Sequence, residues 1–181
     1  MVKRTYWYVS TLVLLSMSSV CLAQNAAGAR QLEQNKLEQT AFATKLIEAK
    51  TDDERATLLT QNKELITAEL TQLFLGQGRD HLQQGNMNLA IKSFEIATLV
   101  AKQNDDKVLL ARALTTLGNI YRMQGNDEIA LRHLRQALTL HEAQANARGI
   151  FFSLLYIVML DISANNYDEA RLQRLLKLAE E

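Results

Sequence analysis

The sequence predicts an all-α protein that is built as a solenoid of helical hairpins. The chain has 181 residues and no proline, although about nine would be expected at the average usage of roughly 5%. Since proline breaks helices, its absence favours an almost wholly helical chain. Hydrophobic residues make up 48% of the sequence but aromatic residues only 6%. A third observation, a pattern of small residues that recurs every forty positions, predicts stacked repeats.

The composition also excludes several classes of protein. The 20 basic and 20 acidic residues balance to a formal net charge of zero, whereas nucleic-acid binding normally requires a basic surface. We therefore expect no nucleic acid among the partners. With only 7 glycines and one cysteine, the chain is neither collagen-like nor stapled by disulfides. Its apolar fraction is that of a globular domain and not of a disordered chain.

Residues 1–23 have the three parts of a secretory signal peptide. A cationic start is followed by an apolar run at 6–20, and small residues stand three and one positions before the cut that we expect after Ala23. Cleavage would leave residues 24–181, exported to a bacterial periplasm or out of the cell. We expect no membrane insertion of this mature chain, which contains no cysteine.

Two alternatives to cleavage remain open for this segment. A retained transmembrane anchor needs about 20 predominantly apolar residues, but the apolar run is shorter and carries four serines. A lipid anchor on Cys21 would make the chain a bacterial lipoprotein. The preceding Ser18-Ser19-Val20 differs from the Leu-small-small pattern that is typical of such processing. Cleavage after Ala23 is therefore the favoured interpretation.

A forty-residue repeat organises the region that follows. The positions that recur are Gly78 and Gly118, the pairs Gly85-Asn86, Gly125-Asn126 and Asn165-Asn166, the residues Ala90, Ala130 and Ala170, and the pair Phe94 and Leu134. Small residues on facing helices let the two helices of a hairpin approach closely, and a glycine ends the first helix where the chain turns. One unit cannot bury its own apolar stripe, so neighbouring units must stack.

The second unit resembles a known repeat when residues 106–143 are read in full. The matching positions are Leu114, Leu117, Gly118, Tyr121, Gly125, Ala130, Leu134 and Ala137. They resemble the tetratricopeptide pattern, in which W-x2-LG-x2-Y is followed by A-x3-F and a later small residue. The resemblance implies hairpins wound into a right-handed superhelix that binds proteins.

The units follow this pattern to different extents. They are placed at about 71–104, 111–144 and 151–181, within a repeat domain at 67–181. The third unit has polar residues, including Asp161 and Arg174, where small or apolar ones belong, so it is either a degenerate unit or a C-terminal cap. A period of forty exceeds the usual 34 by six, which predicts a variant with lengthened helices.

Residues 24–66 are predicted to form a helical lead-in. Thr51 and Glu54 have the spacing of a capping box, in which each side chain bonds a free backbone amide at a helix start. The run at 53–67 resembles the helices that precede tetratricopeptide arrays in bacterial proteins, including those that end in a caspase-like CHAT protease domain. No protease domain follows in this sequence, so no protease activity is carried over. An accessory subunit of a separate hydrolase is a further hypothesis.

Residues suited to catalysis are few. The three histidines, His81, His133 and His141, do not pair on one helical turn as zinc ligands would. The carboxylate pairs Asp52-Asp53 and Asp105-Asp106 stand at helix starts, where they are better explained as caps. The mature chain has no serine or cysteine nucleophile motif. We therefore predict a protein that is not an enzyme and holds no metal or cofactor.

A polar stripe on the second unit is the candidate ligand surface. The stripe comprises Arg112, Thr115, Asn119 and Arg122. Their spacing of i, i+3, i+7 and i+10 places them on one helix face. The tetratricopeptide resemblance implies that this is the concave side, formed by the helices at 67–84, 107–124 and 147–164. Further candidates there are Arg79, Phe152, Tyr156 and Met159.

These residues predict a groove that is cationic and polar at one end and apolar at the other. Such a groove suits a protein or peptide segment that carries both a carboxylate and hydrophobic anchors. The alternative is a solvated helix face with no ligand. The run at 150–160 is apolar around the whole helix, which indicates burial within the chain or an interface with a second copy. A self-associating structural or regulatory homodimer is therefore the alternative function.

Overall fold

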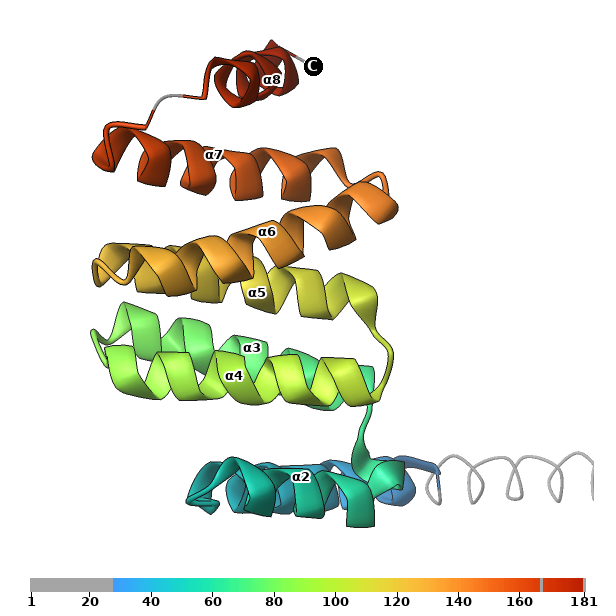
Figure 1. The fold of residues 1–181 in the computed structure, drawn as a ribbon. Helices are drawn as coiled ribbons and strands as arrows, with labels where there is room; N and C mark the ends of the chain where they lie inside the picture. Colours follow the sequence, from blue (N-terminus) through green and yellow to red (C-terminus); the bar gives the residue numbers. More distant parts are fainter. Residues whose placement is uncertain (1–27, 167, 181) are drawn as a thin grey trace, which may run out of the picture. The chain divides into compact units, whose positions relative to one another are not determined.

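The computed structural model describes residues 28–166 and 168–180, and all the secondary structure of these residues is helical (Figure 1). This confirms the predicted all-α class. The signal peptide predicted at 1–23 lies outside the described residues. Among the helices that are described, none has both the length and the apolar character needed to cross a membrane.

The chain divides into two compact units, at 1–42 and 43–181. Residues 28–42 of the first unit are helical. The second unit contains every helix that the repeat pattern predicts. All the candidate ligand residues therefore lie in this second unit.

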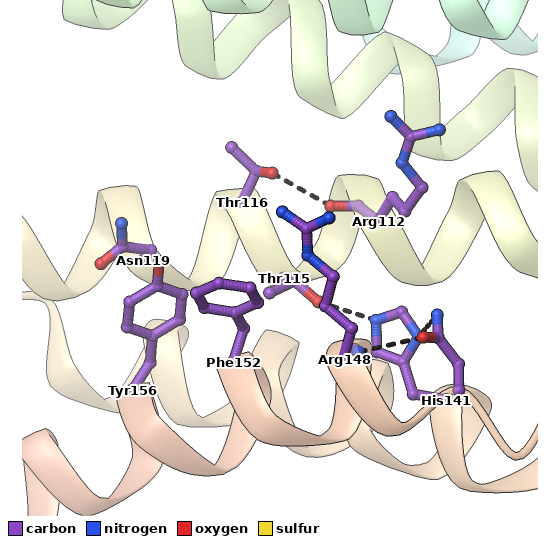
Figure 2. A pocket seen from close by; sticks show the side chains of 10 residues that line it. Arg112, Thr115, Thr116, Asn119, His141, Arg148, Phe152 and Tyr156 are labelled. Carbon is purple, nitrogen blue, oxygen red and sulfur yellow. Dashed lines mark hydrogen bonds between the residues drawn. The ribbon is translucent and has the colours of Figure 1, made fainter. Parts of the chain in front are cut away.

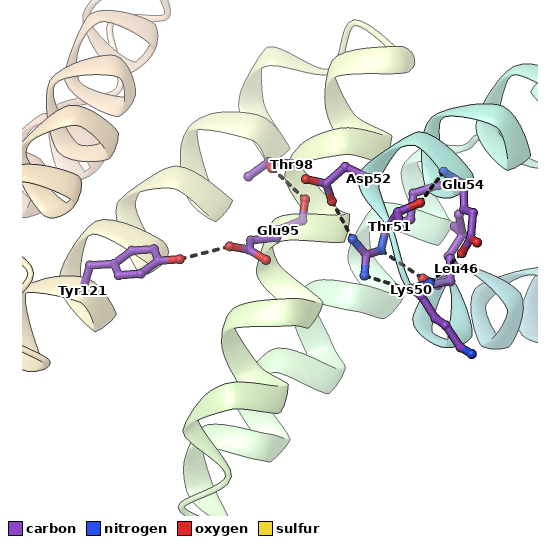
Figure 3. Close-up of polar contacts among 10 residues, drawn as sticks. Leu46, Lys50, Thr51, Asp52, Glu54, Glu95, Thr98 and Tyr121 are labelled. Atoms are coloured by element: carbon purple, nitrogen blue, oxygen red, sulfur yellow. Dashed lines mark hydrogen bonds and ion pairs between the residues drawn. The ribbon is translucent and has the colours of Figure 1, made fainter.

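A helical corner opens the second unit. Residues 43–48 are helical, and helix α2 follows at Asp52–Gln61. The Thr51 hydroxyl accepts a hydrogen bond from the Glu54 amide at 3.1 Å, and the Glu54 carboxylate accepts one from the Lys50 amide at 2.7 Å (Figure 3). The predicted capping box is thus confirmed, except that the return bond reaches the amide one residue before the cap.

Arg55 holds this corner together. Its guanidinium donates to the carbonyl oxygens of Leu46, at 3.3 Å, and Ala49, at 2.9 Å. It also pairs with the Asp52 carboxylate at 2.6 Å. These bonds satisfy two carbonyls that the end of the preceding helix leaves free. A short 3-10 turn, η1 (Lys63–Leu65), then leads to the repeats.

Five long helices form the repeat array. They are α3 (Ala68–Gln83), α4 (Met87–Gln103), α5 (Lys107–Met123), α6 (Asp127–Ala143) and α7 (Ala147–Ser163). The first helix of each unit lies within one residue of its predicted bounds. Figure 1 shows α3 paired with α4 and α5 paired with α6, and the pairs are stacked on one another. Because α3, α5 and α7 approach one another more closely than α4 and α6 do, these first helices line the inner side of the stack.

The turns between helices recur every twenty residues, which is half the period visible in the sequence. At each turn one residue has a positive φ: Gly85 (76°), Asp105 (50°), Gly125 (75°), Ala145 (51°) and Asn165 (56°). The residue that follows the positive-φ residue donates its amide hydrogen to the carbonyl oxygen of the residue five positions before itself, as a Schellman turn requires. In this way the Asn126 amide donates to the Tyr121 carbonyl oxygen at 2.9 Å. Helices α3 to α7 therefore all end by the same backbone device, although only two of the five positions carry glycine.

Replacing Ala145 by glycine is expected to raise the free energy of unfolding by about 1 kcal/mol, because a left-handed conformation costs a residue with a Cβ about 1–2 kcal/mol. Gly125→Ala is the matched control. A Cβ at Gly125 would meet no atom within 4 Å, so only the backbone term changes and stability should fall by a similar amount. Urea denaturation of both variants measures the two values. A loss of stability in Ala145→Gly would contradict this explanation.

Close approach within the hairpins depends on the glycines that the repeat pattern identified. A Cβ on Gly118 would lie 2.5 Å from Cγ of Leu134 and 3.2 Å from the carbonyl oxygen of Ala130. A Cβ on Gly78 would lie 2.7 Å from the ring of Phe94. Leu134, Ala130 and Phe94 are almost wholly buried. The helices can therefore pack at this distance only because these two positions lack side chains.

Tyr121 links the first and second units. Its hydroxyl donates to the Glu95 carboxylate of α4 at 3.0 Å (Figure 3), and its ring stacks on His133 with the centroids 5.6 Å apart. Burial, followed by the nearby Glu95 charge, raises the pKa of Tyr121 to about 12. The phenol therefore stays a hydrogen-bond donor throughout the physiological range.

The third unit departs from the hairpin pattern. Helix α8 (Glu169–Glu180) is seen nearly end-on beside α7 in Figure 1, whereas α3 to α7 lie across the view. Arg171 of α8 pairs with Asp161 of α7, and Arg174 pairs with Glu142 of α6 at 2.7 Å. The polar residues that interrupt the repeat pattern therefore hold α8 in its different position.

One face of the apolar run at 150–160 is buried by the chain itself. Leu154, Ile157 and Leu160 are each at most 2% exposed. Exposed apolar side chains remain toward its C-terminal end, where Met159 is 40% and Ile162 50% exposed. Burial within the chain thus accounts for the middle of α7 but not for this end.

Candidate functional site

A pocket of about 480 Å³ lies between α5 and α7, next to the turn that joins α6 to α7 (Figure 2). Helix α5 contributes Arg112, Thr115, Thr116 and Asn119. The C-terminal turn of α6, the connection after it and α7 contribute His141, Asn146, Arg148, Gly149, Phe152 and Tyr156. Since α5 and α7 are first helices of their units, the pocket opens on the inner side of the stack.

The pocket brings together five of the eight candidate residues. These five are Arg112, Thr115, Asn119, Phe152 and Tyr156. Arg122 lies beside them and contacts two of them. Arg79, which is exposed on α3, and Met159, which is exposed on α7, do not line this pocket.

Two stacked aromatic rings with an arginine against each of them form one wall. Arg148, Phe152 and Tyr156 lie four residues apart on α7, so they share one helix face. The guanidinium of Arg148 lies 5.8 Å from the Phe152 ring centroid, and the Phe152 and Tyr156 rings stack at 6.4 Å. Arg122 of α5 lies over the Tyr156 ring at 5.7 Å. The two distances from a guanidinium to a ring fall within the range of cation–π attraction, so both guanidiniums are held against the wall.

Asn119 is oriented by the same arginine. Its side-chain oxygen accepts hydrogen bonds from Nη2 of Arg122 at 2.9 Å and from Nε at 3.2 Å. Arg122 therefore joins the polar wall on α5 to the aromatic wall on α7. Asn119 is fixed before any ligand arrives.

The pocket is cationic. Arg112 and Arg148 line it, Arg122 lies at its edge, and no aspartate or glutamate is among the lining residues. In the part of the chain that the structure describes, none of these three guanidiniums forms a salt bridge. Unpaired guanidiniums attract carboxylates and can bind them through two parallel hydrogen bonds.

The floor of the pocket is polar and fully hydrogen-bonded. His141, only 2% exposed, contacts the Thr115 hydroxyl through Nε2 at 3.2 Å and the Asn146 amide nitrogen through Nδ1 at 3.2 Å. Burial lowers the pKa of His141 below its usual range. The imidazole is therefore neutral at pH 7 and adds no charge to the pocket.

Sequence reasoning missed half of the lining. The missed residues are Thr116, His141, Asn146, Arg148 and Gly149. Arg148 lies one helical turn before Phe152, so the helical spacing alone could have identified it. His141 and Asn146 reach the pocket because of the turn between α6 and α7, and no spacing along a single helix signals that.

The described side chains include no group of three or more histidine, cysteine, aspartate or glutamate residues placed to hold a metal ion. The polar groups of the pocket are arginine, amide, hydroxyl and one neutral imidazole. This set can bind an anion and an apolar side chain together. Such a set of groups suits the binding of a ligand.

The fold and the pocket define a class, the helical-hairpin repeat proteins that carry a binding surface on the inner helices. Residues 69–143, which include all of α4, α5 and α6, match the tetratricopeptide repeat family. This part of the chain therefore consists of tetratricopeptide repeats. Tetratricopeptide repeats generally mediate protein–protein interaction and typically serve as non-enzymatic scaffolds. A search of curated proteins finds no match. The matched region excludes the run at 53–67, whose resemblance to the lead-in of CHAT proteins stays a prediction.

Proposed function

We propose that this chain is an exported adaptor that binds a segment of a partner protein in the pocket between α5 and α7. One observation carries the proposal: three arginines that have no carboxylate partner among the described residues surround one pocket, and two of them are held against its aromatic wall. Export is proposed from the signal-peptide pattern of residues 1–23. The adaptor has no catalytic role.

The chemistry of the walls specifies the segment. Arg112 and Arg148 lie on different helices at the same pocket, so a single carboxylate between them can be bonded from both sides. Phe152 and Tyr156 are half-buried, and their free surface suits an aromatic or large aliphatic side chain. The expected ligand is therefore an aspartate or glutamate within a few residues of an apolar anchor.

Selection from a displayed library of random peptides tests this proposal. The full chain is expected to enrich peptides that combine an acidic residue with an aromatic or large aliphatic one. A variant with Arg112→Gln, Arg148→Gln and Phe152→Ala should lose these peptides. Arg135→Gln is the control, since Arg135 is exposed on α6 and does not line the pocket. Enrichment of the same peptides by the triple variant, or no enrichment by the full chain, would contradict the proposal. We call the enriched peptide of highest affinity the reference peptide.

Self-association is a second candidate, and exposed apolar side chains near the C-terminal end of the array favour it. Ile162 is 50%, Leu172 41% and Leu176 56% exposed. Ile162 and Leu172 also line a hollow of about 310 Å³ between α7 and α8. Sedimentation of the full chain distinguishes the two candidate functions, because a chain that is monomeric at all concentrations would exclude self-association.

A further inference from the structure

A one-way chain of hydrogen bonds runs beneath the pocket from α7 to α5. The Gly149 amide donates to Oδ1 of Asn146 at 3.1 Å, which caps the start of α7. Asn146 in turn contacts Nδ1 of His141 through its amide nitrogen. Nε2 of His141 contacts the Thr115 hydroxyl (Figure 2). The Thr115 hydroxyl donates to the carbonyl oxygen of Ala111 at 2.9 Å.

The direction of these bonds fixes the protonation of His141. The Thr115 hydroxyl donates to Ala111 and can therefore accept from Nε2 of His141 when Nε2 carries the proton. Since Oδ1 of Asn146 accepts from Gly149, its amide nitrogen faces Nδ1 as a donor. Nδ1 must then be an acceptor without a proton. Only one neutral tautomer satisfies the whole chain.

A proton on Nδ1 cannot be accommodated by rotating Asn146. In the present orientation the new N–H would face the amide hydrogens of Asn146. With the amide flipped, Oδ1 would face His141, but the amide hydrogens would then face the Gly149 N–H. Either arrangement sets two donors against each other and loses one hydrogen bond at a buried site. Protonation of His141 therefore weakens the cap of α7.

The first turn of α7 also rests directly on the imidazole. A Cβ on Gly149 would overlap the His141 ring, so only glycine allows α7 to lie this close to α6. This turn carries Arg148, and Phe152 follows one turn later. The position of His141 thus sets the position of the cationic and aromatic wall.

We propose that neutral His141 is the positioning residue for the α7 wall of the pocket, and that its protonation displaces this wall and releases the bound protein segment in acid. This assignment rests on the proposed function and names its regulation. The charged groups on the elements packed against His141 are Arg112 of α5 and Arg148 of α7, which line the same pocket. Glu142, the next residue of α6, pairs with Arg174 of α8.

The proposed release of the bound segment occurs when the pH falls. Burial lowers the pKa of His141 from its usual 6.5, so the folded chain binds this proton less readily than the unfolded chain does. The contribution of neutral His141 to stability is fully present above pH 6.5 and is lost as the pH falls through the lowered pKa of the folded chain. His133 of the same helix shows the same direction, through burial and the charges of Arg132 and Lys102, but it does not line the pocket.

Nuclear magnetic resonance of the full chain tests the assignment without a ligand. Near neutral pH we expect a proton on Nε2 of His141 and none on Nδ1. As the pH falls toward about 5, the Gly149 amide should lose protection from hydrogen exchange in step with protonation of His141. Protection that stays constant while His141 titrates, or a neutral tautomer with the proton on Nδ1, would overturn the assignment.

Two variants and a control sharpen this experiment. In Asn146→Asp the carboxylate can accept both from Gly149 and from a proton on Nδ1, so Gly149 should keep its protection in acid; this variant retains a good helix cap. In His141→Gln the protection should no longer depend on pH. His133→Gln removes the other histidine of α6, which does not line the pocket, and should behave as the unmodified chain. A pH response in Asn146→Asp equal to that of the unmodified chain would overturn the assignment.

The reference peptide connects this device to binding. Its affinity for the full chain should fall about tenfold or more between pH 7.5 and about pH 5. In Asn146→Asp the added carboxylate lowers the affinity at both pH values, but the ratio of the two affinities should stay close to one. Equal affinity at both pH values would contradict the assignment of His141 alone. No affinity at either pH would contradict the proposed function, and the exchange measurement would still decide the role of His141.

Discussion

Gly118→Ala is expected to lower the free energy of unfolding by about 3 kcal/mol, the upper part of the range for overpacking a tight core. The new methyl group would lie 2.5 Å from Cγ of Leu134 and 3.2 Å from the carbonyl oxygen of Ala130. The Leu134 side chain is fully buried and has little room to move, and the Ala130 oxygen belongs to helical backbone. The two helices of the second unit must therefore separate.

Gly76→Ala is the matched control, since Gly76 also lies inside a first helix. A Cβ there would meet no atom within 4 Å, so alanine should raise stability by about 0.5–1 kcal/mol through its better helix propensity. Guanidinium denaturation of the two variants should thus give changes of opposite sign. Equal stabilisation by both would contradict the close packing of α5 on α6. The double variant Gly118→Ala with Leu134→Ala should lose less stability than the sum of the losses in the two single variants.

Replacing Arg112 and Arg148 together by glutamine is expected to weaken binding of the reference peptide by about 100-fold or more. Each guanidinium should contribute one charge-assisted hydrogen bond to the carboxylate, with about 1.5–3 kcal/mol lost per bond, and about 1.4 kcal/mol corresponds to tenfold. Calorimetric titration measures the change. The double variant should also lose most of the salt dependence of the affinity, because exposed charges are screened by salt.

Arg135→Gln serves as the control for this second prediction. It removes an exposed arginine of α6 that lies outside the pocket, and so changes the net charge without changing the site. We expect a change in affinity below about twofold, the usual size of an effect from a distant surface charge. If Arg135→Gln and the double variant weakened binding equally, the attraction would come from overall charge and not from the pocket.

The repeat was predictable from the sequence because two kinds of position recur. Gly78 and Gly118 mark the close approach of the helices, while Gly85 and Gly125 mark the turns. The twenty-residue period of the backbone was not predicted, because Asp105, Ala145 and Asn165 adopt the same positive φ without being glycine. Tertiary packing of the flanking helices imposes that conformation, and amino-acid type does not reveal it.

The third unit shows a similar limit. The sequence indicated that Asp161 and Arg174 break the repeat pattern, but it left open whether this region is a degenerate unit or a cap. The structure shows that Asp161 pairs with Arg171 and that Arg174 pairs with Glu142. These pairs span different helices, so no periodicity within one helix could predict them.

The candidate site was predictable only where one helix carries it. Spacing along α5 identified Arg112, Thr115 and Asn119, which the pocket contains. The same spacing included Arg79 on α3, which the pocket does not reach. His141 was interpreted as an ordinary histidine, because its role depends on Thr115, 26 positions earlier.

Mapping of the reference peptide on the full chain by nuclear magnetic resonance tests the central claim most directly. The side-chain Nε–H signals of arginine report each guanidinium separately. We predict that the signals of Arg112, Arg122 and Arg148 shift on titration with the peptide, while those of Arg55 and Arg135 do not. Shifts confined to arginines outside the pocket, or spread evenly over all of them, would contradict the assignment of the binding site to the surface between α5 and α7.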